Sequence, residues 1–538
     1  MTSFRQCLDF IKGDFFERSR RYSFLLTLGF ALYAGYTFLP ANHSNYVTLQ
    51  IGGHRGIYNS AWIGALAAMH SALFLSIAGF YLVKNSIARD RQTGVGQILA
   101  ATRMSKVSYL TMKALSNFLV LGSMVIVIII AAAGMQLLRA EDAHINPWQL
   151  ISPFVLITLP VLAIVSALAV LFESVRWLRG GLGNVVFFFL WMFGVSSEAL
   201  EVDAAMGTNI VISQMKTATH EAFPDYNPDS GAVSMGYNIA GEGETMDLTT
   251  FKWSGIRWTA GSVAMRVMLY GIAAGLILFS TYFFDRFDAQ PALPASGKRW
   301  RRKRRDSTDT IEKEGIISVQ ETNEMHPHLS RLASLPQASR FGQMLIAEIK
   351  LMFKGVSRWW MIIALGMVIT GLSVPLEASR EFLLPFAWVW PILLWSKMGT
   401  REARFRTDQI LFSSPKPLWR QFPAVWLAGV LLAMLTGSGV AIRLMIAGDF
   451  YGVFAWLVGA MFIPTMALTF GVWSGSGKMF EVLYLLLWYA GPMNKVPLLD
   501  YMGSSAKALA EDTPIVFLVV IIILLTLALA GRKRQLTI

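Results

Sequence analysis

The sequence contains one cysteine, Cys7, and only 15% of its 538 residues are charged. A single cysteine excludes a disulfide framework and any metal cluster held by several cysteines. The low charge argues against a water-soluble enzyme, because soluble domains carry about 25% charged residues. The hydrophobic content of 54% argues against a disordered chain, which would be polar. The composition therefore indicates a chain built for an apolar environment.

The apolar residues gather in long segments, and a helix that crosses a bilayer needs about 20 residues of this kind. Two of the apolar segments, Phe382–Ser396 and Met479–Pro492, are short for this purpose. The sequence nevertheless predicts an all-α integral membrane protein with twelve transmembrane helices in two pseudo-symmetric six-helix bundles. The predicted spans are Tyr22–Leu39, Ala61–Val83, Val107–Gly134, Ser152–Phe172, Gly181–Val195, Thr259–Phe284, Trp359–Val374, Phe382–Ser396, Pro423–Ile442, Gly452–Val472, Met479–Pro492 and Pro514–Ala530.

Lysine and arginine are distributed unevenly between successive loops. With the N-terminus inside, the inner loops hold most of the basic residues and the outer loops hold few, as the positive-inside rule requires. We therefore expect a multi-pass protein of a plasma membrane, a bacterial inner membrane, with both termini in the cytoplasm. The outer segment 199–258 is long and acidic, and we expect it to form a cap, a gate or a surface for an extracytoplasmic partner.

Two amphipathic segments precede the two sets of spans. Residues 1–21 place Phe4, Leu8, Ile11 and Phe15 at helical spacing among charged residues, which indicates a helix on the membrane surface. Residues 340–355 have the same position before the second set. The chain thus divides into an interfacial helix (1–21), a first six-span half (22–286), a cytoplasmic linker (287–339), a second half with its own interfacial helix (340–531) and a tail (532–538).

The linker carries a dense run of basic residues. Beside a span, such a run attracts anionic lipid at about 1 kcal/mol per basic residue. Nucleic-acid binding is the alternative reading, and we disfavour it because a multi-span chain cannot leave the membrane. The predicted lipid-contacting residues are Lys298, Arg299, Arg301, Arg302, Lys303, Arg304 and Arg305.

The strongest pattern is an internal repeat in two inner loops. Arg89-Asp90, after the second predicted span, corresponds to Arg401-Glu402, after the eighth, at an offset of 312. The tripeptide Gln-Ile-Leu recurs at 97–99 and 409–411 with the same offset. A duplicated unit predicts a pseudo-two-fold axis along the membrane normal, with a path between the halves. The mixture of both charge signs favours a docking surface for a partner over a merely solvated loop.

The first of these loops resembles the first cytoplasmic loop of permeases of the second class of ABC exporters. The second half departs from the pattern of this family, because Asp408 replaces the glycine of the turn, and its coupling to a partner is therefore expected to differ. The features that carry the resemblance are Asp90-Arg91, Thr93-Gly94, Ile98-Leu99, Thr102 and Lys113.

The resemblance implies a fused pair of permease halves that is not an enzyme by itself. It implies two copies of a cytosolic ABC ATPase subunit as partners, with ATP and Mg²⁺ bound by that subunit and no cofactor bound by this chain. The cargo would be an amphipathic drug, peptide or lipid, exported between the halves along their second and fifth spans. The expected docking residues are Arg89, Asp90, Arg91, Gln92, Thr93, Gly94, Gln97, Arg401, Glu402, Arg404, Asp408 and Gln409.

Other motifs give weaker evidence of function. The segment Gly475–Lys478 looks like a phosphate loop, but Val472 and Met479 occupy positions where that motif requires glycine and serine or threonine. His70 and Ser71 lie midway along the second predicted span and are candidates for the translocation path, because intramembrane ionisable residues are commonly functional. A neutral histidine bonded to a hydroxyl or carbonyl group of a neighbouring helix is the alternative.

Glu173 and Arg176, near the inner end of the fourth span, are expected to form a local ion pair. Two further functions stay open at this point. An ion-coupled secondary transporter would be expected to place paired acidic residues in mid-span. A membrane-embedded enzyme of lipid or glycan metabolism would be expected to cluster polar catalytic residues.

Overall fold

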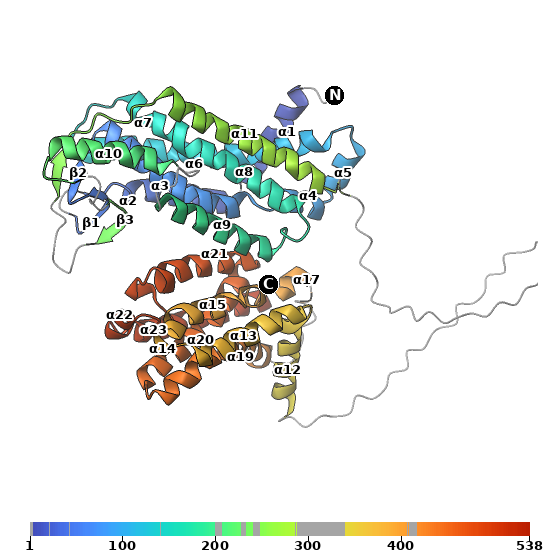
Figure 1. Cartoon of the computed structure of the whole chain (residues 1–538). Helices are drawn as coiled ribbons and strands as arrows, with labels where there is room; N and C mark the ends of the chain where they lie inside the picture. The colour runs from blue at the N-terminus through green and yellow to red at the C-terminus, as the bar shows by residue number, and fades with distance from the viewer. Residues whose placement is uncertain are drawn as a thin grey trace, which may run out of the picture.

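A computed structural model of the chain describes residues 4–20, 22–41, 44–139, 141–199, 207–227, 233–239, 248–285, 287, 339–405, 407 and 417–537. The run of basic residues at 298–305 and the predicted docking residues Asp408 and Gln409 lie outside this part of the chain. Helices predominate in the described residues. They fall into a first half, up to residue 285, and a second half, from residue 339 onward (Figure 1).

The helices of the first half begin and end where local signals place them. Asn59 caps α3 by accepting a hydrogen bond from the Trp62 amide, and Thr259 begins α11 with a reciprocal pair of bonds to Ser262. The longer helices of this half are α1 (Phe4–Ser19), α2 (Tyr22–Thr37), α3 (Ser60–Val83), α6 (Lys106–Arg139), α8 (Leu159–Ser174), α9 (Gly181–Ala199) and α11 (Ala260–Phe283).

A short helix, α7 (Pro147–Pro153), leads into α8 through a π-helical turn, η1 (Phe154–Thr158). Pro153 and Pro160 flank this turn, and a proline has no amide hydrogen to give to the regular helical ladder. The three elements make one apolar segment, 147–174, which contains the fourth predicted span.

The second half repeats this order with more interruptions. Helix α12 (Ser339–Phe353) meets α13 (Arg358–Ser373) at a bend of 106°, as an interfacial helix followed by a span would. The span predicted at 382–396 is broken into α14 (Leu376–Ala378), η2 (Ser379–Leu383), α15 (Leu384–Val389) and α16 (Ile392–Trp395). The remaining elements are α17 (Arg401–Phe405), α19 (Pro417–Ile446), α20 (Phe450–Ser474), α21 (Gly477–Trp488), η3 (Tyr489–Met493), η4 (Pro497–Leu499), α22 (Ala506–Ala510) and α23 (Thr513–Thr537).

Every predicted span coincides with helical structure, but the helices differ in length. Seven of the described helices are long and apolar enough to cross a membrane, or eight if α12 and α13 count as one broken span. Helix α9 is apolar but shorter, and α21 has only 12 residues before it widens into η3. The structure is thus that of a mainly helical membrane protein with seven or eight such spans.

One end of the molecule also holds a small sheet, which the sequence did not predict. Two strands after α2, β1 (Tyr46–Ile51) and β2 (His54–Gly56), pair with two strands from the outer segment, β3 (Val233–Ile239) and β4 (Thr249–Phe251), in the order β3-β1-β2-β4. The β1–β3 pair is antiparallel and the β2–β4 pair is parallel. Together with α10 (Thr208–Ala222), the sheet gives segment 199–258 a folded framework.

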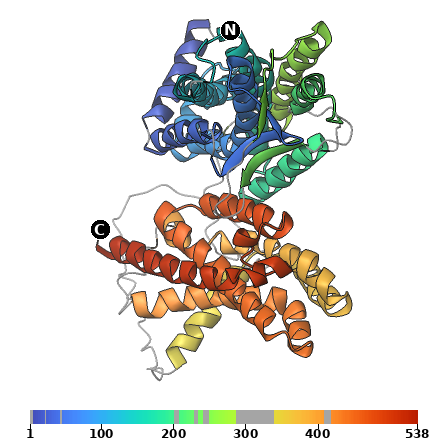
Figure 2. The ribbon, with the colours of Figure 1, turned by 90° about the vertical axis from the view of Figure 1, so that its left-hand side faces the viewer.

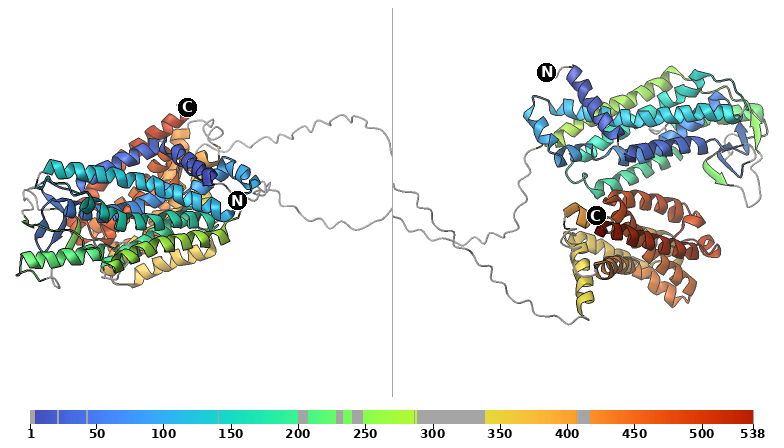
Figure 3. Two further views of the ribbon diagram at one scale, coloured as in Figure 1. Left: turned by 90° about the horizontal axis from the view of Figure 1, so that it is seen from above. Right: turned by 180° about the vertical axis from the view of Figure 1, so that it is seen from behind.

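The two halves lie side by side and meet along α9 and α21 (Figures 1 and 2). The sheet and α10 lie at one end of the first half, whereas two short helices, α4 (Ser86–Gln92) and α5 (Val95–Ala101), lie at the opposite end. The view from behind shows the same separation (Figure 3). The segments predicted to lie on the two sides of the membrane, 199–258 outside and the α4–α5 loop inside, are therefore at opposite ends of the first half.

Candidate functional site

Helices α4 and α5 form the loop that carries the repeated motif of the first half. Gly94 has a φ of +77° and makes the turn between them, a conformation that residues with a Cβ atom rarely adopt. The loop is therefore a pair of short helices, and Val95 and Ile98 of the second one are exposed.

Glu173, at the end of α8, fixes the start of α4. One carboxylate oxygen accepts hydrogen bonds from the amides of Asn85 and Ser86, at 2.7 and 2.9 Å. The other oxygen accepts from the amides of Ile87 and Ala88, at 2.7 and 2.8 Å. These amides have no partner within the helix, and a carboxylate is the group that a helix N-terminus favours. The predicted local pair with Arg176 was wrong, because the carboxylate turns to the loop.

Asp90 ties α4 to α6. Its carboxylate accepts from the Tyr109 hydroxyl at 2.6 Å and lies 2.9 Å from Lys113 Nζ. The same ammonium contacts Asp14 of α1 at 2.7 Å, so one buried lysine joins three helices. Its desolvation is offset by two carboxylates, which makes loss of either partner unfavourable.

The interfacial helix α1 docks on the bundle through polar residues. Asp14 also contacts Arg18 at 2.5 Å, and Arg18 donates to the Asn117 side chain at 2.6 Å. Burial by itself would raise the pKa of Asp14, but the charges of Arg18 and Lys113 and the hydrogen bonds from Lys113 and Ser116 lower it below the usual 3.8. Of the apolar residues of α1, Ile11 is buried against the bundle, whereas Leu8 is exposed.

The second half reproduces this bonding at equivalent positions. Arg89 pairs with Glu17 of α1, and Arg401 pairs with Glu348 of α12 at 3.1 Å. Glu402, the counterpart of Asp90, accepts from the Gln421 side chain at 3.0 Å. It also contacts Arg532 of α23 at 3.1 Å. Each inner loop is thus held to its interfacial helix and to the following span.

These contacts change the roles expected for several motif residues. Asp90 and Glu402 are buried and bonded internally, so their carboxylates position the loops and are not free to meet a partner. Arg89 and Arg401 are occupied with the interfacial helices. The exposed residues of the first loop are Gln92, Thr93 and Gln97, with Val95 and Ile98, while Arg91 is half-buried. Arg404 belongs to α17.

The two residues predicted for the translocation path lie inside the first half. His70 Nδ1 is 2.9 Å from the Leu66 carbonyl oxygen, and the ring packs on Phe38, the residue after α2, with centroids 5.0 Å apart. Ser71 is fully buried beside it in α3. Neither residue takes part in the contacts between the halves described below. His70 is therefore a buried residue whose Nδ1 contacts the backbone of its own helix, and the path role of His70 and Ser71 stays a prediction.

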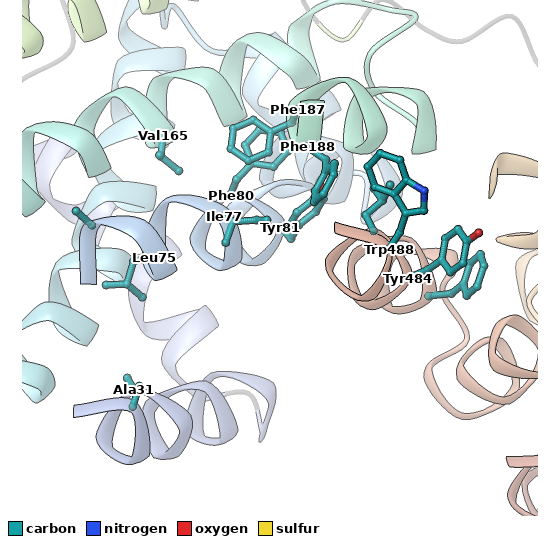
Figure 4. Packing of buried hydrophobic residues seen from close by; sticks show 14 of the residues in the cluster. Ala31, Leu75, Ile77, Phe80, Tyr81, Val165, Phe187, Phe188, Tyr484 and Trp488 are labelled. Carbon is teal, nitrogen blue, oxygen red and sulfur yellow. The ribbon is translucent and has the colours of Figure 1, made fainter. Parts of the chain in front are cut away.

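Aromatic side chains form one part of the contact between the halves. Phe188 and Phe189 of α9 lie 6.4 and 5.9 Å from Trp488 of α21, between ring centroids, and Trp191 lies 6.2 Å from Tyr489. Figure 4 shows Phe188 and Trp488 on facing elements. These helices are the fifth apolar segments of their halves. Packed aromatic rings therefore join these two helices at this level.

A polar network forms the other part, at the ends of α9 and α21 nearest the inner loops. Asn184 of α9 donates to Glu481 of α21 at 2.5 Å and accepts from Lys84, which follows α3, at 2.7 Å. Lys478 donates to the Lys84 carbonyl oxygen at 3.0 Å. Gly181 permits this approach, because a Cβ there would lie 2.5 Å from Glu481 Oε1. We call Lys84, Asn184, Lys478 and Glu481 the seam network.

Sequence reasoning missed the seam network. Glu481 was the available signal, because it is an acidic residue inside a predicted span. Within the part of the chain that the structure describes, no group of three or more His, Cys, Asp or Glu side chains is arranged to hold a metal ion. Comparisons with known protein families, with curated proteins and with solved structures find no match to this chain.

Proposed function

We propose that the chain is the permease of an ABC exporter, with two fused six-span halves and two separate ATPase subunits docked on its inner loops. The observation that carries the proposal is the equivalent bonding of the two loops. In each half an arginine pairs with the interfacial helix, and the next residue, an acid, bonds to the residue 19 positions later at the start of the following span. Such duplicated anchoring fits two docking sites on one chain.

The exposed face of α4 and α5 is the proposed docking surface in the first half. Ile98 and Val95 present apolar surface beside the amide groups of Gln92 and Gln97. An apolar centre with a polar margin is the usual composition of a protein interface. The buried anchors beneath, Asp90 and Glu173, would pass a displacement of this surface on to α6 and α8.

The test is co-expression of the full chain with ABC ATPase subunits from the same genome, followed by affinity purification and measurement of ATP hydrolysis. We expect Ile98→Asp to abolish co-purification and the stimulation of hydrolysis. Trp177→Asp is the control, because Trp177 is equally exposed in another inner turn of the same half. Retention of the ATPase by Ile98→Asp, or no ATPase bound to the unsubstituted chain, would contradict the proposal.

One observation favours a second candidate, an ion-coupled transporter. Glu481 is buried between the halves, and among the described residues no basic group lies within ion-pair distance of its carboxylate. A carboxylate in that position is suited to carry a proton. This function requires transport that depends on a proton gradient without any ATPase and that is lost in Glu481→Gln. Transport that requires the ATPase instead would dismiss it.

A further inference from the structure

The amide of Asn184 lies between a positive and a negative side chain from different parts of the molecule. Its oxygen accepts from the Lys84 ammonium and its nitrogen donates to the Glu481 carboxylate. The two charges fix the orientation of the amide, because only this orientation gives each of them a suitable partner. Lys84, Asn184 and Glu481 are all buried. The amide thus bridges an ammonium of the first half and a carboxylate of the second.

Lys84 is connected to the docking loop by the chain itself. The next residue, Asn85, has a φ of +87°, a conformation that asparagine tolerates better than most residues. The amides of residues 85–88 are held by Glu173. Lys84 is therefore the last residue before the capped start of α4, and a shift of α4 must move its backbone.

The second half is connected to Lys84 by hydrogen bonds in two ways. Glu481 reaches the Lys84 side chain through Asn184, and Lys478 donates directly to the Lys84 carbonyl oxygen. Separating the halves at this end would break both connections, so that the buried Glu481 carboxylate would lose Asn184 and the half-buried Lys478 ammonium would lose the Lys84 carbonyl. Such groups are unfavourable in an apolar interior until water reaches them. The network can therefore exist in a closed, dry state or in an open, hydrated state.

We propose that the seam network is a lock that holds the ends of the two halves together on the cytoplasmic side and opens when α4 is displaced. The lock deepens the proposed function by naming the contact through which the docking loop would control the path. Its closed state is a property of the chain alone, without ATPase, nucleotide or cargo.

The test uses the full chain in lipid nanodiscs, with Cys7→Ser and spin labels on cysteines that replace the exposed residues Gln97 and Trp419, one in each half. Pulsed electron paramagnetic resonance gives the distribution of distances between the labels. We expect Asn184→Leu to add a population at longer distance, raising the open-to-closed ratio about tenfold or more, because the charge-assisted hydrogen bond of Asn184 to Glu481, which crosses between the halves, is lost.

Gln136→Leu is the matched control. Gln136 is also a buried amide, but its bonds to Ser60 and to the carbonyls of Asp142 and His144 stay within the first half. We expect its distance distribution to equal that of the unsubstituted chain. If Asn184→Leu fails to fold, Glu481→Gln keeps the shape and removes one charge, and it is expected to give a smaller shift in the same direction.

A second measurement tests the connection to α4. Hydrogen exchange of the amides at 85–88 should become faster in Asn184→Leu and stay unchanged in Gln136→Leu. Unchanged distances in both Asn184→Leu and Glu481→Gln would overturn the lock, and unchanged exchange in Asn184→Leu would overturn its connection to α4. Neither result depends on an ATPase, so failure of the lock and failure of the proposed function are distinguishable.

Discussion

The Tyr109 hydroxyl donates to the Asp90 carboxylate at 2.6 Å, and the same bond recurs 312 residues later. There the Gln421 side chain donates to Glu402 at 3.0 Å. The acids are of different length and the donors are of different type, yet both bonds join an inner loop to the start of the next long helix. The repeat in the sequence is therefore a repeat of contacts, and those contacts are internal to each half.

Lys113 is expected to be the most sensitive residue of the first inner loop. Lys113→Met leaves Asp14 and Asp90 buried without their shared cation, and removing one partner of a buried ion pair typically destabilises a protein by about 3–5 kcal/mol. The measurement is the free energy of unfolding of the purified chain in detergent. Lys106→Met, at the exposed start of the same helix, should change it by less than about 0.5 kcal/mol. Equal effects of the two variants would refute the anchoring role.

Glu173→Gln should loosen the start of α4. A glutamine keeps one acceptor oxygen but turns an amide nitrogen toward two of the four backbone amides that the carboxylate now binds. Hydrogen exchange at residues 85–88 should become about tenfold faster or more, as expected when bonds to a charged group are lost. Glu221→Gln, on the exposed face of α10, serves as the control. Slow exchange in Glu173→Gln would show that other contacts hold the helix.

Stability at low pH should depend on Asp14. Its pKa in the folded chain is lower than in the unfolded chain, so its contribution is present above the unfolded pKa near 3.8 and is lost as the pH falls through the folded pKa. The unfolding temperature of Asp14→Asn should therefore lie below that of the unsubstituted chain at pH 6, and the two should converge below pH 4. Asp9→Asn, on the exposed side of α1, should show no such convergence.

The apolar segments and the repeated loop could be predicted from the sequence because their signals are local. Runs of apolar residues mark helices, and a constant offset marks equivalent loops. Burial of individual polar groups could not be predicted in this way. Asp90 looks like a surface charge in a basic loop, and only the approach of Lys113, on another helix, makes its burial favourable.

Long-range pairing explains the other differences. The sheet joins residues 46–56 with residues 233–251, and the seam network joins Asn184 with Glu481, so neither has a pattern within a short window of sequence. The broken helix at 376–395 was easier to anticipate, since Pro385 and Pro391 lie within the predicted span. Its exact division into short helices depends on packing against α19 and α21.

The number of ATPase subunits per chain tests the central claim most directly. Native mass spectrometry of the complex, purified through a tag on this chain, gives that number without any assumption about cargo. Two fused halves with equivalent inner loops predict one chain with two ATPase subunits. A complex of two chains with two ATPase subunits, or a chain that carries no ATPase at all, would contradict the account.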